Sequence, residues 1–493
     1  MEHYLVIDQG THASRCIVFD SSGSILAQTE SSISIYRQKP QFIEHNPEKI
    51  LASIYYCLDS LQSQGHLSAI TAAALITQRS TIVGWDKASG KALSPAISWQ
   101  DTRAADLLQP LQQDTIEIQK ITGLPLSPHY GASKMQWLIK HNEKCHLAYQ
   151  NNSLVLAPLA SYLIKHLTGL TKAMTDHVNA SRTQLFDINK LDWSPTMLKK
   201  FGLKAGCLPK AKPCLTDYGV LRQISIPLKL VNGDQNAAIF AQGIPPAEAI
   251  LINIGTGAFA LKLTDQPQPQ PKLLQGLAVS QQNKSIFALE ATVNGAGAAL
   301  ATLYNEIEAE HLYKELPNWL SFIHQPPVYI NTISGLGSPW WNNTIKDHYL
   351  DNDACDLDLP EKAVAIIESI IFLLQNNIEL LKDENSRFIF ISGGLSKLDG
   401  LCQKLADLSQ LEVRRLDNPE ASAKGAAWLL ANADHKTAHW KTEEATARFY
   451  PQPNRLLSER YQAFTAHLVT LTKEQEQTLA QATKESIQKQ SNE

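Results

Sequence analysis

Two segments far apart in the chain share one local design: a run of β-branched and aliphatic residues, a Gly-Thr dipeptide and a second apolar run. The first covers residues 4–19 with Gly10-Thr11, and the second covers residues 249–261 with Gly255-Thr256. Each predicts a β-hairpin whose glycine lets the backbone approach a ligand, while exposed N–H groups and a threonine hydroxyl suit phosphate oxygens. An ordinary glycine turn would explain either segment alone. Their repetition, with Asp8 at the end of the first strand, favours two domains that hold one polyphosphate.

The length and charge of the chain limit the alternatives. A chain of 493 residues exceeds one typical hydrophobic core, so two or more domains are expected. The 44 basic and 48 acidic side chains give a formal net charge of -4, and no basic tract points to nucleic acid or to a membrane surface. Any phosphate site must therefore be local. No apolar run approaches the length of a membrane helix and no signal peptide is evident, so we expect a cytoplasmic protein.

The cysteines carry little functional information. All 7 lie outside CxxC pairs, and none has a histidine at zinc-finger spacing. We expect reduced thiols, several of them in the core, rather than a redox or metal site.

Polar residues follow two strand-like runs in the first half of the chain. Residues 72–77 form one run, which ends just before Arg79, and residues 96–99 form another, which ends in Trp99. Parallel sheets place ligands at the carboxyl ends of their strands, so Arg79 and Trp99 are candidates for a binding site. A surface arginine and a tryptophan packed in the core are the alternatives.

A third strand-like run precedes an acidic residue. Residues 228–232 are followed by Gly233-Asp234-Gln235 and then by a helix of small residues at 237–241. A carboxylate at a strand end, close to a helix start, can be held ionised by the helix dipole. The alternative is that Asp234 simply caps the helix.

The order of these segments predicts the domain organisation. Residues Ile244-Pro245-Pro246 suit an interdomain link, because the second Gly-Thr hairpin starts directly after them. A strand at 387–392 is followed by Gly393-Gly394, a third point of close backbone approach. We therefore predict domains at 1–245 and 246–465, with a polar tail at 466–493 that has little to bury.

Taken in order, these segments resemble the FGGY carbohydrate kinases, and among them the glycerol kinases most closely. The resemblance covers nearly the whole chain, to about residue 465. It implies an α/β fold of two ribonuclease H-like, actin-type domains with ATP and substrate in the cleft between them. The stretches that carry it are Asp8-Gln9-Gly10-Thr11, Thr175-Asp176, residues 179–183, Gly233-Asp234-Gln235, Gly255-Thr256-Gly257, residues 335–341 and residues 449–461.

The resemblance also implies a role for each candidate residue. Asp234 would be the catalytic general base, and Asp8 would hold Mg2+ through water, since that ion keeps much of its hydration shell. The acceptor would be bound by Arg79, Ser80, Trp99, His129, Asp234, Gln235 and Phe259. The nucleotide and its phosphates would be bound by Gly10, Thr11, His12, Ala13, Arg15, Gly255, Thr256, Gly297, Gly393 and Gly394. The partners implied are ATP and a small polyol or sugar, without nucleic acid or membrane, in a homodimer or tetramer.

Two departures from the family pattern concern the acceptor. Ser80 stands where glycerol kinases usually carry glutamate, and His129 stands where they carry a tyrosine of the pocket. A shorter Ser80 leaves room for a longer acceptor, because pocket volume and hydroxyl partners decide such preferences. We expect glycerol or a somewhat larger polyol as substrate. A ketopentose kinase of the same family and a catalytically silent sugar- or nucleotide-binding relative are the alternatives.

Overall fold

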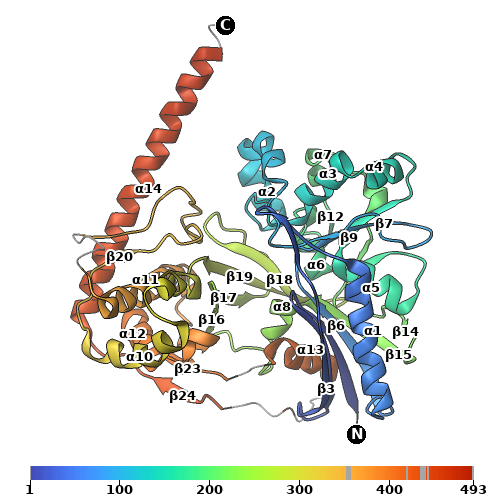
Figure 1. Ribbon diagram of the computed structural model, residues 1–493, viewed down its shortest axis with the longest axis horizontal. Coiled ribbons are helices and arrows are strands. Elements are labelled where there is room, and N and C mark those ends of the chain that lie inside the picture. Colours follow the sequence, from blue (N-terminus) through green and yellow to red (C-terminus); the bar gives the residue numbers. More distant parts are fainter. Residues whose placement is uncertain (1, 351–356, 418–419, 434–439, 441–443, 491–493) are drawn as a thin grey trace. The chain divides into compact units, whose positions relative to one another are not determined.

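The computed structural model describes residues 2–350, 357–417, 420–433, 440 and 444–490, with side chains described up to residue 475. The chain forms two compact units (Figure 1). Unit 1 comprises Met1–Pro245, Leu263–Leu289 and Asn418–Glu443, and unit 2 comprises Pro246–Lys262, Glu290–Asp417 and Glu444–Glu493. The assignment of functional domains to 1–245, 246–465 and 466–493 stays a prediction.

The central sheet of unit 1 begins with the first Gly-Thr hairpin, which forms as predicted. Strands β1 (His3–Gln9) and β2 (Ala13–Asp20) pair antiparallel, and β3 (Ile25–Ser32) pairs with β2. On the other side of β1, strands β6 (Ile70–Thr77) and β15 (Ile226–Gly233) run parallel to it, and the short β14 (Val220–Leu221) closes the edge. Six of the seven residues of β1 are buried, as expected for a strand covered on both faces.

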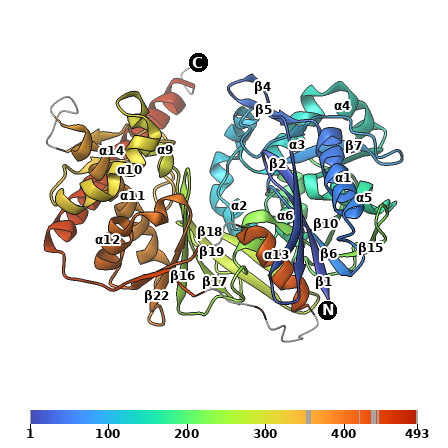
Figure 2. The same ribbon diagram turned by 60° about the horizontal axis from the view of Figure 1, so that its bottom comes forward.

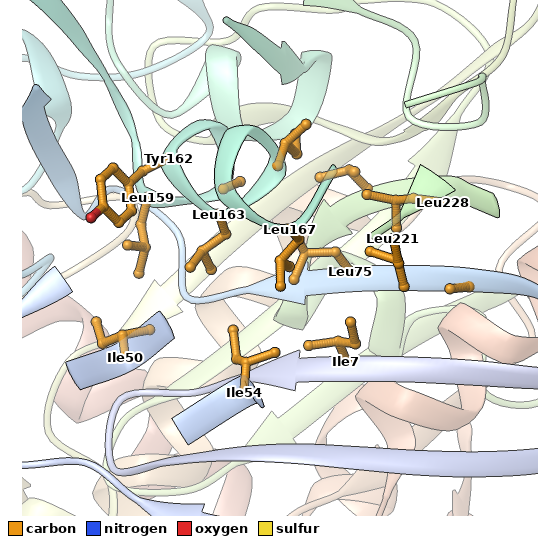
Figure 3. Packing of buried hydrophobic residues seen from close by; sticks show 14 of the residues in the cluster. Ile7, Ile50, Ile54, Leu75, Leu159, Tyr162, Leu163, Leu167, Leu221 and Leu228 are labelled. Carbon is orange, nitrogen blue, oxygen red and sulfur yellow. The ribbon is translucent and has the colours of Figure 1, made fainter. Parts of the chain in front are cut away.

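Helices α1 (Pro47–Ser63) and α5 (Leu159–Thr168) cover one face of this sheet. Figure 3 shows Ile50 and Ile54 of α1 and the leucines of α5 in one buried cluster with Ile7 of β1 and Leu75 of β6. The start of α1 is capped: Asn46 accepts hydrogen bonds from N–H groups of the first turn, and proline occupies the first position, where no N–H is needed.

The opposite face is covered by α8 (Asp234–Ala238) and by α13 (Ala421–Ala431), a helix from late in the chain (Figure 2). The two helices cross closely at Gly425, where an added Cβ would lie 1.9 Å from the carbonyl oxygen of Ala237. Only glycine permits that approach. The core on this side consists of small and aromatic side chains, among them Ala423, Ala426 and Phe240.

A second sheet of unit 1 supports the loops that follow β6. Its order is β4 (Tyr36–Lys39), β5 (Phe42–His45), β8 (Ala96–Ile97), β7 (Ile82–Asp86) and β9 (Leu154–Pro158). Helices α3 (Gly131–His141) and α4 (Glu143–Gln150) pack on it through an apolar cluster that includes Met135 and Leu138. The shorter elements of unit 1 are η1 (Ala105–Asp114), α2 (Thr115–Thr122), β10 (Met174–Asp176), α6 (His177–Ser181), β11 (Phe186–Asp187), β12 (Asp192–Trp193), α7 (Pro195–Lys200), η2 (Ala205–Cys207), β13 (Lys210–Lys212) and β18 (Leu274–Ser280).

Unit 2 contains the second Gly-Thr hairpin, which also forms as predicted. Strands β16 (Ala249–Ile254) and β17 (Ala258–Thr264) pair antiparallel, β22 (Phe388–Ser392) and β23 (Glu412–Arg415) continue the sheet in parallel, and β24 (Ala447–Phe449) is antiparallel to β23. The chain passes from unit 1 to unit 2 within β19 (Ser285–Val293). The remaining elements of unit 2 are α9 (Gly297–Leu300), η3 (Ala301–Asn305), α10 (Ala309–Phe322), β20 (Tyr329–Ile330), β21 (His348–Tyr349), α11 (Leu359–Leu381), η5 (Gly394–Lys397), α12 (Asp399–Ser409) and α14 (Arg455–Gln490).

Two helices of unit 2 bear on the apolar and polar segments expected from the sequence. Among the described residues, α11 is the one helix whose length and apolar composition would allow it to cross a membrane, although no such segment is expected from the sequence. Of its apolar window, 89% is buried, as in the core helix of a folded domain. A capping box of Asp358 and Glu361 starts this helix. Helix α14 continues through the predicted polar tail to Gln490.

Candidate functional site

The candidate residues of unit 1 gather at one edge of its central sheet. Strands β1, β6 and β15 are parallel, and Gln9, Thr77 and Gly233 lie in register at their carboxyl ends. The loops that follow these strands carry Gly10-Thr11, Arg79 and Asp234. Three segments that are distant in sequence therefore present their polar side chains at the same edge, as parallel strands require.

Asp8, at the end of β1, is held in a chain of charged groups. Its side chain is buried, and one carboxylate oxygen accepts a hydrogen bond from Arg15 at 2.7 Å. Arg15 in turn pairs with Glu420 at 2.7 Å, a residue 405 positions away in the sequence. Burial raises the pKa of Asp8 to about 6, Arg15 opposes that rise, and the negative charge of Asp234 adds to it. The carboxyl is therefore mostly ionised at neutral pH and suits a hydrated Mg2+.

Asp234 is the first residue of α8, and the N-cap position belongs to Gly233. The interpretation of Asp234 as a plain N-cap is therefore wrong. Its Oδ1 accepts the backbone N–H of Gln235 at 2.7 Å. Burial raises the pKa of Asp234, while Arg79, this N–H group and Arg182 lower it. The result is a carboxylate of increased basicity, in which two guanidinium groups oppose part of the effect of burial.

Arg79 reaches from the loop after β6 to the helix that starts at Asp234. Its guanidinium donates to the side-chain oxygen of Asn236 at 2.9 Å and to that of Gln235. The structure thus brings Arg79, Asp234 and Gln235 together, as the sequence predicts for acceptor-binding residues. Asn236, which the sequence reasoning did not single out, fixes one arm of the guanidinium.

Trp99 and His129 lie together beside the first hairpin. The indole N–H of Trp99 donates to the hydroxyl of Thr11 at 3.0 Å, and the rings of Trp99 and His129 meet edge to face with centroids 5.8 Å apart. Burial lowers the pKa of His129 well below its usual range, and the positive charges of Lys134, Arg182 and Arg79 lower it further. His129 is therefore a neutral ring, which can donate and accept one hydrogen bond each.

Ser80 occupies a strained position in this cluster. It has a positive φ of 61°, which a non-glycine residue rarely adopts, and its side chain is buried. The hydroxyl lies 3.5 Å from the carbonyl oxygen of Arg182, too long for a strong hydrogen bond. Strain of this kind persists only where the surrounding structure imposes it.

The structure adds residues that the sequence reasoning missed. Lys134 donates a hydrogen bond to the carbonyl oxygen of Ser98, the residue before Trp99. Gln78 donates to the side-chain oxygen of Gln9 and to the carbonyl oxygen of Gly10, both at 3.2 Å. Arg182 is buried and its Nε has no hydrogen-bond partner, although its charge acts on Asp234 and His129. One signal could have found the lysine: it stands between the apolar residues Ala132 and Leu138, which share the buried face of α3.

The turns of both Gly-Thr hairpins close on themselves. The N–H of Gly10 donates to the carbonyl of Ala13 at 2.9 Å, and the N–H of Gly255 donates to that of Gly257 at 2.8 Å. These two N–H groups are therefore used within their own turns. That the hairpins bind phosphate oxygens stays a prediction. Of the other first-loop candidates, His12 is exposed and its carbonyl oxygen accepts the N–H of Ile33.

In unit 2 the second hairpin gathers its candidates through backbone contacts. The N–H of Gly297 donates to the carbonyl of Gly255 at 2.9 Å, and the N–H of Ala298 donates to that of Thr256 at 2.9 Å. Gly255 and Thr256 are exposed. Phe259 lies on β17, opposite Asn253 of β16, in unit 2, whereas the other predicted acceptor residues belong to unit 1.

Gly393 joins the same cluster at the end of β22. It has φ +95°, and an added Cβ would lie 2.4 Å from the carbonyl oxygen of Ile254. A side chain is therefore excluded at this point. Gly394, which starts η5, has open space around it. The structure thus unites Gly255, Thr256, Gly297 and Gly393 around the end of β16.

Comparison with known proteins identifies relatives over almost the whole length. The N-terminal domain model of the FGGY family of carbohydrate kinases matches residues 3–233, and the C-terminal domain model matches residues 250–433. The glycerol kinase of Allorhizobium ampelinum is 30% identical, with 92% of this chain and 93% of that protein covered.

Solved structures show the same fold. Plasmodium falciparum glycerol kinase with ADP has a TM-score of 0.86 at 23% identity and covers 96% of this chain and 98% of its own. Xylulose kinase from Rhodospirillum rubrum has a TM-score of 0.85 at 17% identity and covers 95% and 99%. The predicted α/β fold of two actin-like domains is confirmed.

Proposed function

The chain belongs to the FGGY family of carbohydrate kinases, and we propose that it transfers the terminal phosphoryl group of ATP to a hydroxyl of glycerol or of a somewhat larger polyol. The observation that supports this most is the gathering of Asp8, Arg79 and Asp234 at one sheet edge. Phosphoryl transfer needs an acceptor anchor, a group that takes the hydroxyl proton and neutralisation of phosphate charge. These three residues supply one part each.

In this mechanism the acceptor lies against Arg79 and Gln235, with one hydroxyl directed at Asp234. The hydroxyl oxygen forms the new bond to the γ-phosphorus as the bond from that phosphorus to the bridging oxygen of ADP breaks. The proton passes to Asp234 late, when bond formation has made the hydroxyl acidic. The raised pKa of Asp234 makes it a better base than an exposed aspartate, and the charges of Arg79 and Arg182 oppose that rise.

Asp8 fits the metal role expected of it. A single buried carboxylate can hold a Mg2+ ion that keeps most of its water, and the charge of the ion would neutralise the terminal phosphates. The pairing with Arg15 leaves the carboxylate a second oxygen for a metal-bound water. Arg15 itself brings positive charge beside the first hairpin, where the terminal phosphate is expected.

The acceptor pocket favours a polyol over a strongly charged substrate in our proposal. Its lining combines the neutral ring of His129, the indole of Trp99 and the small side chain of Ser80 with one guanidinium. A ketopentose remains a second candidate, because Ser80 offers no carboxylate to the substrate hydroxyls. A catalytically silent relative has no need for both Asp8 and Asp234. Cytoplasmic location and a homodimer or tetramer stay predictions.

The test is ADP release with Mg-ATP across glycerol, erythritol, ribitol, ribulose and xylulose. We expect turnover on a polyol that disappears in Asp234→Ala, with Asp217→Ala as a matched control, because Asp217 is exposed and pairs with Lys229 outside the site. Turnover on ribulose or xylulose alone would favour the ketopentose kinase. Absence of turnover on the whole panel, despite ADP binding, would overturn the proposal in favour of the silent relative.

A further inference from the structure

Lys134 is a fully buried lysine of α3 that the mechanism does not use. Its Nζ donates to three backbone carbonyl oxygens, those of Ser80 at 3.2 Å, Ser98 at 2.8 Å and His129 at 2.7 Å. None of the ion pairs found among the described residues includes Lys134. Its charge is balanced by carbonyl dipoles instead of by a bonded carboxylate.

This position is energetically unusual. Moving an ammonium group out of water costs several kcal/mol unless hydrogen bonds replace its hydration. An ammonium has three donors, and here each has an acceptor, so the group is saturated. Burial lowers the pKa of Lys134 to about 7, with Asp101 opposing and Arg103 assisting that shift. Ala132, Met135 and Leu138 of the same helix lie in the apolar core. A methionine at position 134 would therefore cost far less desolvation free energy than the lysine does.

The three carbonyl groups belong to three separate loops, and each loop carries an acceptor-side residue. Ser80 directly follows Arg79, Ser98 directly precedes Trp99, and the third carbonyl is that of His129 itself. The anchored peptide of Ser80 also has the positive φ of the strained loop. One ammonium group thus joins the backbones that carry the guanidinium, the indole and the imidazole of the proposed pocket.

We propose that Lys134 is a positioning residue, which sets the spacing of Arg79, Trp99 and His129 by ligating the backbones of their three loops. The proposal rests on the proposed function insofar as this pocket holds the acceptor. Because all three ammonium donors are used by carbonyl groups, Lys134 has none left for a phosphate. Its loss should therefore raise the KM for the acceptor and leave the KM for ATP nearly unchanged.

The first variant is Lys134→Met, which keeps most of the volume and removes the donors. We expect the KM for the acceptor to rise about 10-fold or more, because misplacement of binding groups by about 1 Å has effects of that size and larger. The matched control is Lys404→Met in unit 2, where a lysine at 9% exposure pairs with Glu368 at 2.8 Å and Arg460 remains as a second partner. This control should leave both KM values unchanged. An unchanged acceptor KM in a folded Lys134→Met protein would overturn the proposal.

The second variant, Lys134→Ala, allows a rescue that packing alone cannot produce. Propylammonium replaces the deleted carbons and the ammonium group, so it should restore the acceptor KM, whereas tetramethylammonium, which has no N–H donors, should not. Equal rescue by both cations, or rescue by neither, would contradict positioning through hydrogen bonds. If neither variant folds, Lys134 serves the stability of the whole unit and the proposal is wrong.

Hydrogen exchange separates this proposal from the proposed function. Without any ligand, peptides that cover residues 78–82, 97–101 and 127–131 should exchange faster in Lys134→Met than in the wild type, while the strands β1 and β6 stay protected. The three loops could exchange faster in Lys134→Met while the wild type turns over none of the acceptors. That combination would retain the positioning role and reject the substrate assignment. Unchanged exchange in the three loops would overturn the positioning role.

Discussion

The two Gly-Thr hairpins look alike in sequence, yet they are built into different chemical surroundings. The first is bordered by charged side chains: Asp8, Arg15 and Glu420 form a chain of ion pairs next to it. The second is joined to its neighbours through backbone groups, with Gly297 and Ala298 donating to the carbonyls of Gly255 and Thr256. The same local fold therefore supports two kinds of site. One can position and neutralise reacting groups, and the other can bring backbone close to a ligand.

The difference also has a cost in stability. Burial raises the pKa values of Asp8 and Asp234 and lowers that of Lys134, so it disfavours the charged form of all three groups in unit 1. The hairpin of unit 2 maintains no such charge, and its constraint is steric, at Gly393. Removal of a buried carboxylate from the first site should thus lower activity and raise stability, whereas a side chain added at Gly393 should lower stability.

The largest expected effect is that of Asp234→Asn on turnover. The amide cannot accept the hydroxyl proton, and general base catalysis contributes roughly 10²–10⁴-fold, so kcat should fall by that factor. Because burial disfavours the ionised carboxyl, the variant should be at least as stable as the wild type. Steady-state kinetics and thermal unfolding check both parts. A variant that loses turnover through a lower unfolding temperature would contradict the assignment of Asp234 as a base.

The second prediction concerns the steric constraint in unit 2. Gly393→Ala places a Cβ 2.4 Å from the carbonyl of Ile254 at φ +95°, and we expect a loss of at least about 3 kcal/mol in the free energy of unfolding. Gly394→Ala is the matched control, since nothing lies within 4 Å of its added Cβ. Chemical denaturation measures both. Equal stability of the two variants would show that the close approach at Gly393 is not constraining.

The third prediction follows from the raised pKa of Asp8. Between pH 3.8, the usual value for aspartate, and about 6, the folded protein binds the proton more tightly than the unfolded chain, so stability should fall as the pH rises through this window. Above pH 6 the ionised Asp8 should cost roughly 2–3 kcal/mol, at 1.36 kcal/mol per pKa unit. Asp8→Asn should remove this pH dependence in denaturant titrations and be more stable at pH 7.

The same group should act in the opposite direction on activity. A metal carboxylate must be ionised, so kcat/KM should decline as the pH falls through about 6. Asp8→Asn should be nearly inactive at every pH. A wild-type activity profile that is flat between pH 5 and pH 7 would argue against Asp8 as the Mg2+ carboxylate.

Much of this comparison could be predicted from the sequence, because its main parts are local. Apolar runs on both sides of Gly10-Thr11 and of Gly255-Thr256 predict both hairpins. Local patterns also indicate which strand ends carry Arg79 and Asp234. The order of these motifs identified the family.

The remaining features depend on residues that only the fold brings together. Nothing near Arg15 in sequence points to Glu420, and nothing in residues 418–443 predicts that this segment returns to unit 1. The hydrogen bonds of the Gly10 and Gly255 N–H groups depend on turn geometry, which composition does not determine. Lys134 looks like one charged residue on a helix until three distant carbonyl groups surround its Nζ.

The smallest effect compares the two threonines of the hairpins directly. The hydroxyl of Thr11 accepts the indole N–H of Trp99 at 3.0 Å, whereas Thr256 is exposed. Thr11→Val leaves that partly buried N–H without its partner and should cost about 1 kcal/mol in the free energy of unfolding. Thr256→Val should stay within about 0.5 kcal/mol of the wild type, as surface substitutions do. Chemical denaturation resolves the two values, and the fluorescence of Trp99 should change only in Thr11→Val. Equal losses of unfolding free energy in both variants would mean that the side-chain hydrogen bond of the first hairpin adds no stability beyond what the backbone of the second hairpin provides.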